Sequence, residues 1–242
     1  MTDMLINNVD IAAFGARLMT FNVSGTAVTN NTSAAGNLLR LPVLYGCTLA
    51  VRTITVALSF NPKSVNGSSR GKAIPQRLHA SAKNITGFES EIIGKPVELF
   101  LPDGFWYSCL YTGSTPSEPD ATGITDVTYT FSGIRHLPLV SEEVPASGMI
   151  YCLSNTKTAF RIIITTAAAL ESLTVNGITV NDLPANSELI IDSVNGLVTC
   201  NGVNKFKDTD LIDFPYLDPG SNFISCSSSV SGIKVEYTPI YM

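Results

Sequence analysis

Apolar and polar residues alternate one by one in several runs of this chain. The clearest run covers residues 53–60, and two others cover residues 127–131 and 233–237. Successive side chains of a strand point to opposite faces, so this period of two predicts half-buried β-strands. In the first run the apolar positions are Ile54, Val56, Leu58 and Phe60. The Thr/Ser face of that strand is left for solvent or for a subunit contact, and the strand has no charge to protect an exposed edge.

Turn-forming pairs separate many of the predicted strands. Asn195-Gly196 and Asn176-Gly177 tolerate positive φ at both positions, which a two-residue type I′ hairpin requires. Asn7-Asn8 and Asp103-Gly104 predict two further hairpins. Folding residues 188–201 back at Asn195-Gly196 puts Leu189, Ile191, Val198 and Cys200 on one buried face, with Ile191 opposite Cys200 and Ser193 opposite Val198.

The period changes once, between residues 78 and 92. Apolar residues recur there every three or four positions, which predicts the buried stripe of a helix that ends near Gly94. The stripe consists of Leu78, Ala82, Ile85, Phe88 and Ile92. Gly87 weakens the middle, so a pair of short helices is the alternative.

The composition changes at residues 141–145, and we place a domain boundary at about residue 140. Residues 1–140 carry ten basic and nine acidic side chains, whereas residues 141–242 carry five and eleven. Dense strand signals with one helical stretch predict a mostly β chain of two domains, the second a small antiparallel sandwich.

Composition narrows the function classes. The chain is 45% hydrophobic and 14% charged, with a net charge of −5, so it offers no basic face for nucleic acid. This low fraction of charged residues has two interpretations. Part of the surface is hidden in an assembly, or the chain is a β protein rich in Ser, Thr and Asn. We recognise no signal peptide and no apolar stretch long enough for a membrane-spanning helix. Five widely spaced cysteines (Cys47, Cys109, Cys152, Cys200 and Cys226) lack disulfide or metal spacing, which predicts five free thiols.

Candidate chemistry is sparse, and we predict no catalytic, cofactor-binding or metal-binding residue. His79 and His136 lack a partner at triad spacing in the sequence, and Glu142-Glu143 is interpreted as a charged linker. The set Asp208, Asp210 and Asp213 lacks the glycine and distal glutamate of an EF-hand, so a solvated acidic loop is expected instead of a calcium site. No phosphate loop, nucleophile elbow or HExxH motif is present.

Sugar-binding sandwiches stack rings on exposed aromatic faces, but Trp106, the single tryptophan, lies in the first domain. The second domain offers eight aromatic residues, several of them expected in the core: Tyr151, Phe160, Phe206, Phe214, Tyr216, Phe223, Tyr237 and Tyr241.

Several stretches together resemble the distal tail proteins of long, non-contractile-tailed phages. In the first domain they are LINNVDI (residues 5–11) followed by Phe14-Gly15, LPDGFWY (101–107) and YTFSGIRH (129–136); in the second domain they are the Ile-Asp strand end, the Asn-Gly turn, and FPYLDPGSN (214–222). Asn8 stands where that family usually has glycine, a mild departure because asparagine also adopts the left-handed conformation.

The resemblance implies a structural virion protein and not an enzyme. Residues 1–140 would be a β-barrel or sandwich belt domain with a short helix, and residues 141–242 a galectin-like β-sandwich. Six copies would form a ring at the virion tail tip, after assembly in the bacterial cytoplasm. The ring would join the tail-tube protein to tail-tip and receptor-binding proteins, with no cofactor, nucleic acid or membrane insertion. Two alternatives remain open, a carbohydrate-binding module for a host glycan and a glycosidase, which needs two facing carboxylates.

Overall fold

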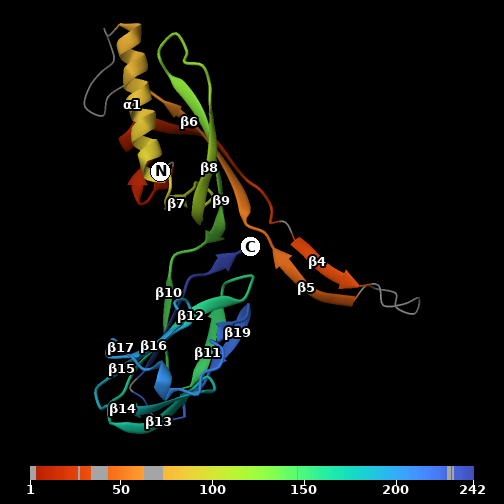
Figure 1. Ribbon diagram of the computed structural model, residues 1–242, viewed down its shortest axis with the longest axis vertical. Coiled ribbons are helices and arrows are strands. Elements are labelled where there is room, and N and C mark those ends of the chain that lie inside the picture. The colour runs from red at the N-terminus through yellow and green to blue at the C-terminus, as the bar shows by residue number, and fades with distance from the viewer. Residues whose placement is uncertain are drawn as a thin grey trace. The chain divides into compact units, whose positions relative to one another are not determined.

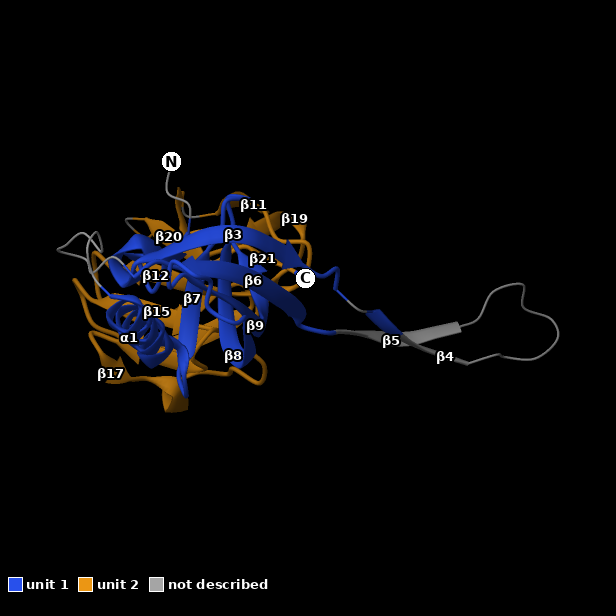
Figure 2. Cartoon of the chain, turned by 90° about the horizontal axis from the view of Figure 1, so that it is seen from above, with its two compact units in different colours: residues 1–136, 242 blue, residues 137–241 orange. Residues whose placement is uncertain are grey.

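A computed structural model describes residues 4–26, 28–33, 43–62, 73–145, 147–227, 230 and 232–242. The chain divides into unit 1, residues 1–136 with 242, and unit 2, residues 137–241 (Figures 1 and 2). The fold is mostly β, as the alternation predicted, with antiparallel strand pairs throughout both units. No helix in these ranges is long and apolar enough to cross a membrane.

Unit 1 is built on a sheet with the strand order β2-β1-β7-β8-β9-β6-β3. These strands are β1 (Leu5–Ile6), β2 (Val9–Asp10), β3 (Ala16–Val23), β6 (Arg52–Phe60), β7 (Pro96–Phe100), β8 (Trp106–Pro116) and β9 (Thr125–His136), with the 3-10 helix η1 (Ile11–Phe14) after β2. Strands β4 (Val28–Ser33) and β5 (Val43–Leu49) pair with each other as a separate hairpin.

Strand β6 confirms the predicted alternation. Its edges, which were expected to be exposed or to meet another subunit, are both paired within the sheet. Ile54, Val56, Leu58 and Phe60 are fully buried. However, β6 lies between β3 and β9, which cover both of its edges. The lack of charge in residues 53–60 therefore reflects an interior position, and β3 is the edge strand on that side of the sheet.

Helix α1 (Ile74–Ile92) is one continuous helix of 19 residues, so Gly87 does not divide it (Figure 1). It packs on the sheet through Phe88, whose ring lies 5.8 Å from Phe60 and 4.9 Å from Tyr129 between centroids. Ala82 was expected in the buried stripe but is exposed. Ser81 is buried instead, and its hydroxyl keeps a hydrogen-bond partner by donating to the Phe60 carbonyl at 3.3 Å.

Unit 2 consists of short antiparallel strands. They are β10 (Val140–Val144), β11 (Gly148–Cys152), β12 (Thr158–Thr165), β13 (Leu170–Val175), β14 (Ile178–Leu183), β15 (Glu188–Asp192), β16 (Leu197–Cys200), β17 (Val203–Asn204), β18 (Tyr216–Leu217), β19 (Gly220–Ile224), β20 (Ile233–Tyr237) and β21 (Ile240–Tyr241), with the 3-10 helix η2 (Phe206–Asp208). The larger sheet has the order β10-β20-β12-β15-β16-β17.

The second layer of unit 2 is made of the hairpin β13–β14 and the pair β11–β19. A bridge between Val175 and Cys226 links these two pairs. Alternate residues of both layers meet in one core that includes Ile162, Val180 and Val235. Tyr237 is buried in this core, and its hydroxyl donates to the Tyr151 carbonyl at 2.9 Å.

The hairpin predicted at Asn7-Asn8 and the type I′ turn predicted at Asn176-Gly177 are confirmed. Asn176 and Gly177 have φ of 50° and 83°, and Asn7 and Asn8 have 48° and 64°. The register predicted at Asn195-Gly196 is wrong by two residues, because Ile191 faces Val198 and Leu189 faces Cys200. Residues 193–196 all lie in the loop, since the Asp192 carboxylate accepts the N–H groups of the next residues and closes a wider turn. The buried face is unchanged, because a shift of two residues preserves the alternation.

Four cysteines are free thiols: Cys109, Cys152, Cys200 and Cys226. The side chain of Cys47 lies outside the described part of the chain.

Candidate functional site

The outer face of the larger sheet in unit 2 carries a row of charged side chains. Strand alternation buries Ile162, Ile164 and Val235 and turns their neighbours outward. The register then places Lys234 beside Ile163, and Arg161 between Glu236 and Asp192. Charges that are distant in sequence thus become cross-strand neighbours.

These charges form a connected network. The Arg161 guanidinium donates to the Asp192 carboxylate through Nη2 at 2.8 Å and Nε at 3.1 Å, and its Nη1 lies 3.7 Å from Glu236. Lys234 Nζ lies 2.6 Å from the other oxygen of Glu236. Burial alone would raise the pKa of Asp192, but hydrogen bonds from Asn195 and Arg161 outweigh it and lower that pKa. Lys234 and Arg161 are therefore engaged by Glu236 and Asp192.

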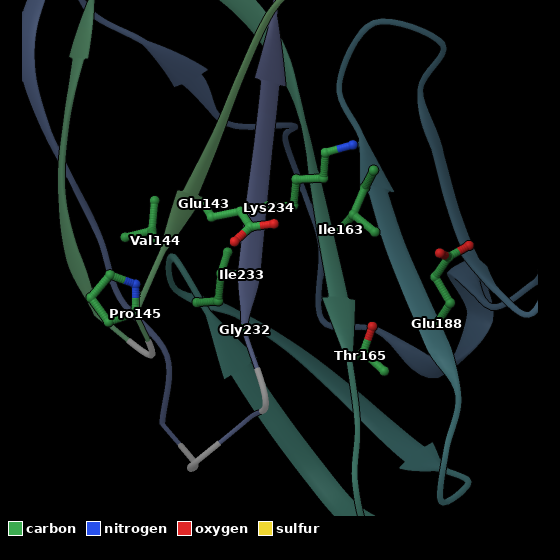
Figure 3. A pocket seen from close by; sticks show the side chains of 9 residues that line it. All are labelled: Glu143, Val144, Pro145, Ile163, Thr165, Glu188, Gly232, Ile233 and Lys234. Atoms are coloured by element: carbon green, nitrogen blue, oxygen red, sulfur yellow. The ribbon is translucent and has the colours of Figure 1, made fainter.

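Next to this network the face is hollowed into a groove of about 590 Å³ (Figure 3). Its lining comes from β10, β12, β15 and β20 and the residues beside them: Glu143, Val144, Pro145, Ile163, Thr165, Glu188, Gly232, Ile233 and Lys234. In Figure 3, Glu143 and Glu188 lie on opposite sides, with Ile163 between them. Within the described ranges neither carboxylate forms an ion pair. Glu143, expected in a linker, is instead an exposed residue of β10.

Unit 1 brings His136 into a polar cluster that the sequence did not reveal. His136 Nε2 lies 2.9 Å from Glu98 Oε2 and 3.0 Å from Ser108 Oγ, and Ser108 Oγ donates to Glu98 Oε1 at 2.5 Å. A Ser-His-acid triad needs the acid on the other imidazole nitrogen. Here Nε2 meets both the serine and the acid, so the arrangement differs from that of a triad, and the cluster links strands β7, β8 and β9. His79 lies exposed on α1.

The three aspartates of the acidic loop have separate roles. Asp208 pairs with Lys205 at 2.6 Å, and Asp210 accepts the N–H of Thr179 at 2.6 Å. Hydrogen bonds from Thr179 lower the pKa of Asp210. Asp213 is exposed, and no potential metal-binding group of three side chains occurs among the residues described.

The aromatic residues of unit 2 are more exposed than expected. Only Phe160 and Tyr237 are fully buried, whereas Tyr151 and Phe223 are 61% and 58% exposed. Tyr216 and Phe206 are also exposed, and Phe206 lies against half-buried Phe214. Tyr241 is half-buried. In unit 1, Trp106 is half-buried and packs against Phe100 with ring centroids 5.1 Å apart, so only part of its surface is open.

Comparison with known proteins places these features in context. Residues 153–241 match the family model described as "Siphovirus-type tail component, C-terminal domain". No curated protein matches the sequence.

Solved structures give a match over nearly the whole chain. The crystal structure of the Dit protein of phage SPP1, titled a paradigm of the hub adsorption apparatus in phages that infect Gram-positive bacteria, aligns with a TM-score of 0.75 and 14% identity over 99% of both chains. Two structures of the phage p2 baseplate in its activated conformation, with calcium and with strontium, align with TM-scores of 0.51 and 0.50. Each is 12% identical and covers 95% of this chain and 92% of its own.

The resemblance to phage distal tail proteins is therefore confirmed: residues 153–241 match the siphovirus-type tail component family, and the chain as a whole has the fold of a Dit hub protein.

Proposed function

We propose that this chain is a structural hub protein of a phage tail tip, in which six copies form a closed ring. The ring joins the end of the tail tube to tail-tip and receptor-binding components. The observation that carries this proposal is the alignment with SPP1 Dit over 99% of both chains, because it covers both units and not a single shared module.

The outer face of the unit 1 sheet supports the ring. At the centre of this face, alternation turns short uncharged side chains outward on three adjacent strands, and the register aligns Asn22 with Thr55 and Thr130, and Thr20 with Ala57 and Thr128. Arg17 and Asp126 lie at one end of the face, on either side of Ser59. The cores of subunit interfaces are depleted in charge, since ions lose hydration when they are buried. A second copy can therefore cover this uncharged centre without desolvating an ion.

The charge distribution supports a ring that is formed by the first part of the chain, with the second part outside it. Residues 1–140 carry a net charge of +1, whereas residues 141–242 carry −6. Copies of the acidic part repel one another at low salt, so it is better placed at the periphery as a docking platform.

The test is the mass of the purified chain by light scattering, together with two lysine variants. The intact chain should give six times 25.8 kDa. Thr55→Lys places a charge in this uncharged centre and should reduce the mass to that of a folded monomer. Asn181→Lys, at an exposed position of β14, is the matched control and should keep the ring. A wild-type chain that is monomeric at every concentration, or a Thr55→Lys ring of full mass, contradicts the proposal.

Carbohydrate binding is the second candidate, and one observation favours it. Tyr151 of β11 and Phe223 of β19 project from the same outward face, and each is more than half exposed. Exposed aromatic faces of this kind can stack on sugar rings. Binding on a glycan array that is abolished by Tyr151→Ala and Phe223→Ala would establish this activity, and an array without binding would count against it.

A further inference from the structure

We propose that the groove between Glu143 and Glu188 docks an extended segment of a partner tail-tip protein that bears two basic side chains flanking an apolar one. This inference rests on the proposed function for the existence of such a partner. The recognition itself is argued from the charges and spacings of unit 2.

The first argument is charge complementarity. Lys234 lies beside Glu143 in the sheet, but its ammonium is 2.6 Å from Glu236. Glu188 belongs to β15, where its neighbour on β12 is the uncharged Thr165. Among the described side chains, neither Glu143 nor Glu188 has a cation within ion-pair distance. A bound segment can therefore add two cations without breaking an existing pair.

The second argument is the apolar centre of the same face. Ile163 lines the groove, and its register partner Ile190 also faces outward, and both are half-buried. Ile163 lies on β12, between the strands that carry the two glutamates, and Ile190 lies on β15, two residues from Glu188. A partner side chain laid over them removes apolar surface from water, at about 25 cal/mol per Å². The occupant thus needs an apolar residue between its basic ones.

Strand geometry sets the spacing of those residues. Strands β10 and β15 are three steps apart in the sheet order, and steps of about 4.8 Å give about 14 Å across the strands. Glu188 is also offset by two residues along the strands relative to Ile163. The two glutamates are thus about 16 Å apart at their backbones. In an extended segment, residues i, i+2 and i+4 share one face and span about 13 Å. Flexible lysine side chains cover the remaining distance.

The pattern that fits is therefore Lys-x-Leu-x-Lys, with the leucine over Ile163. An acidic or uncharged segment places no cation at either glutamate. A helix places i and i+4 only about 6 Å apart along its axis, which is too short for both contacts.

The test uses the full chain and a fluorescein-labelled synthetic peptide, Thr-Lys-Thr-Leu-Thr-Lys-Thr, with fluorescence anisotropy as the readout. The wild-type chain should bind this peptide more tightly than the same peptide with both lysines replaced by glutamate. Loss of two exposed ion pairs in Glu143→Gln/Glu188→Gln should weaken binding about tenfold. The affinity of the wild type should fall as salt is raised.

The matched control is Glu171→Gln/Asp213→Asn, which removes two exposed charges from unit 2 outside the groove. It should bind the peptide like the wild type. Equal weakening in both double variants would show general electrostatic attraction and overturn the docking site. Equal affinity of the lysine and glutamate peptides would also overturn the docking site. The same holds if Glu143→Gln/Glu188→Gln loses glycan binding while its peptide binding is unchanged.

Light scattering on the same variants separates this inference from the proposed function. A ring of full mass with no peptide binding refutes the groove alone. Peptide binding that depends on the two glutamates, by a chain that forms no ring, refutes the hub proposal and leaves the recognition chemistry standing.

Discussion

Replacing Asp192 with alanine should destabilise unit 2 more than any other loss of a single charge on its outer sheet face. The residue is 5% exposed, and its carboxylate accepts hydrogen bonds from two donors of Arg161, from the Val194 N–H, and from the backbone and side-chain nitrogens of Asn195. It therefore ties β12 to β15 and closes the loop at residues 193–196. Alanine can replace none of these contacts.

The magnitude follows from the exposure of the partners. Breaking a fully buried ion pair costs about 3–5 kcal/mol. Arg161 has a side chain 38% exposed and retains Glu236 at 3.7 Å, so it can recover hydration and part of its pairing. The loop N–H groups are also partly reached by water. We therefore expect a loss of about 2–3 kcal/mol, a value that also fits hydrogen bonds to a charged group.

Hydrogen–deuterium exchange read by mass spectrometry is the assay, because it reports each unit separately in the intact chain. Peptides from β15 and β16 should lose about 30- to 150-fold in protection, since each 1.4 kcal/mol is a factor of ten. Peptides from β8 and β9 in unit 1 should not change. Asp192→Asn keeps an oxygen that accepts the loop N–H groups but loses the charge, so its effect should be smaller. Asp218→Ala is the control, since that side chain is 69% exposed and lies 3.9 Å from Lys157.

Acid should have the same effect as the Asp192 substitution. The folded-state pKa of Asp192 is lowered, so its contribution is complete above the unfolded value of about 3.9 and is lost as pH falls through the folded pKa. The difference between wild type and Asp192→Ala should therefore shrink below about pH 4. A protection loss under fivefold, or an equal loss in β8 and β9, would refute this role of Asp192.

Five further predictions concern packing, thiols and the two parts of the chain. Gly133→Ala should destabilise unit 1 by about 3 kcal/mol in thermal unfolding, because a Cβ would meet the Ser108 carbonyl oxygen at 2.6 Å and Cys109 Cα at 2.8 Å; Gly113→Ala, where a Cβ meets nothing within 4 Å, is the control. Thiol titration in denaturant should find five free groups per chain, and finding three or fewer would contradict this. In the native state Cys109 should react more slowly than partly exposed Cys226, because burial raises the pKa of the Cys109 thiol to about 12. Residues 141–242 alone should melt cooperatively, and an aggregating fragment would argue against the boundary near residue 140. Finally, residues 1–140 should assemble in light scattering while residues 141–242 stay monomeric, and the reverse result would overturn the proposed division of roles.

The sequence by itself determined the class of fold and most of the core. Alternation is a local property, because every second side chain of a strand points the same way, so it identified the buried face of residues 54–60 and of Ile233, Val235 and Tyr237. The turn at Asn176-Gly177 was also readable, since its positive φ values depend only on those two residues.

Only the tertiary structure decided which strands are neighbours and which outward side chains meet. The interior position of β6 depends on β3 and β9, which no signal within residues 52–60 reveals. The loop at residues 193–196 was wider than predicted because Asp192 competes for the N–H groups that a two-residue turn would use. The Glu98–Ser108–His136 cluster and the groove between Glu143 and Glu188 arise from cross-strand register. Register joins residues up to about a hundred positions apart, so it is set by the packing of whole strands and not by any local pattern.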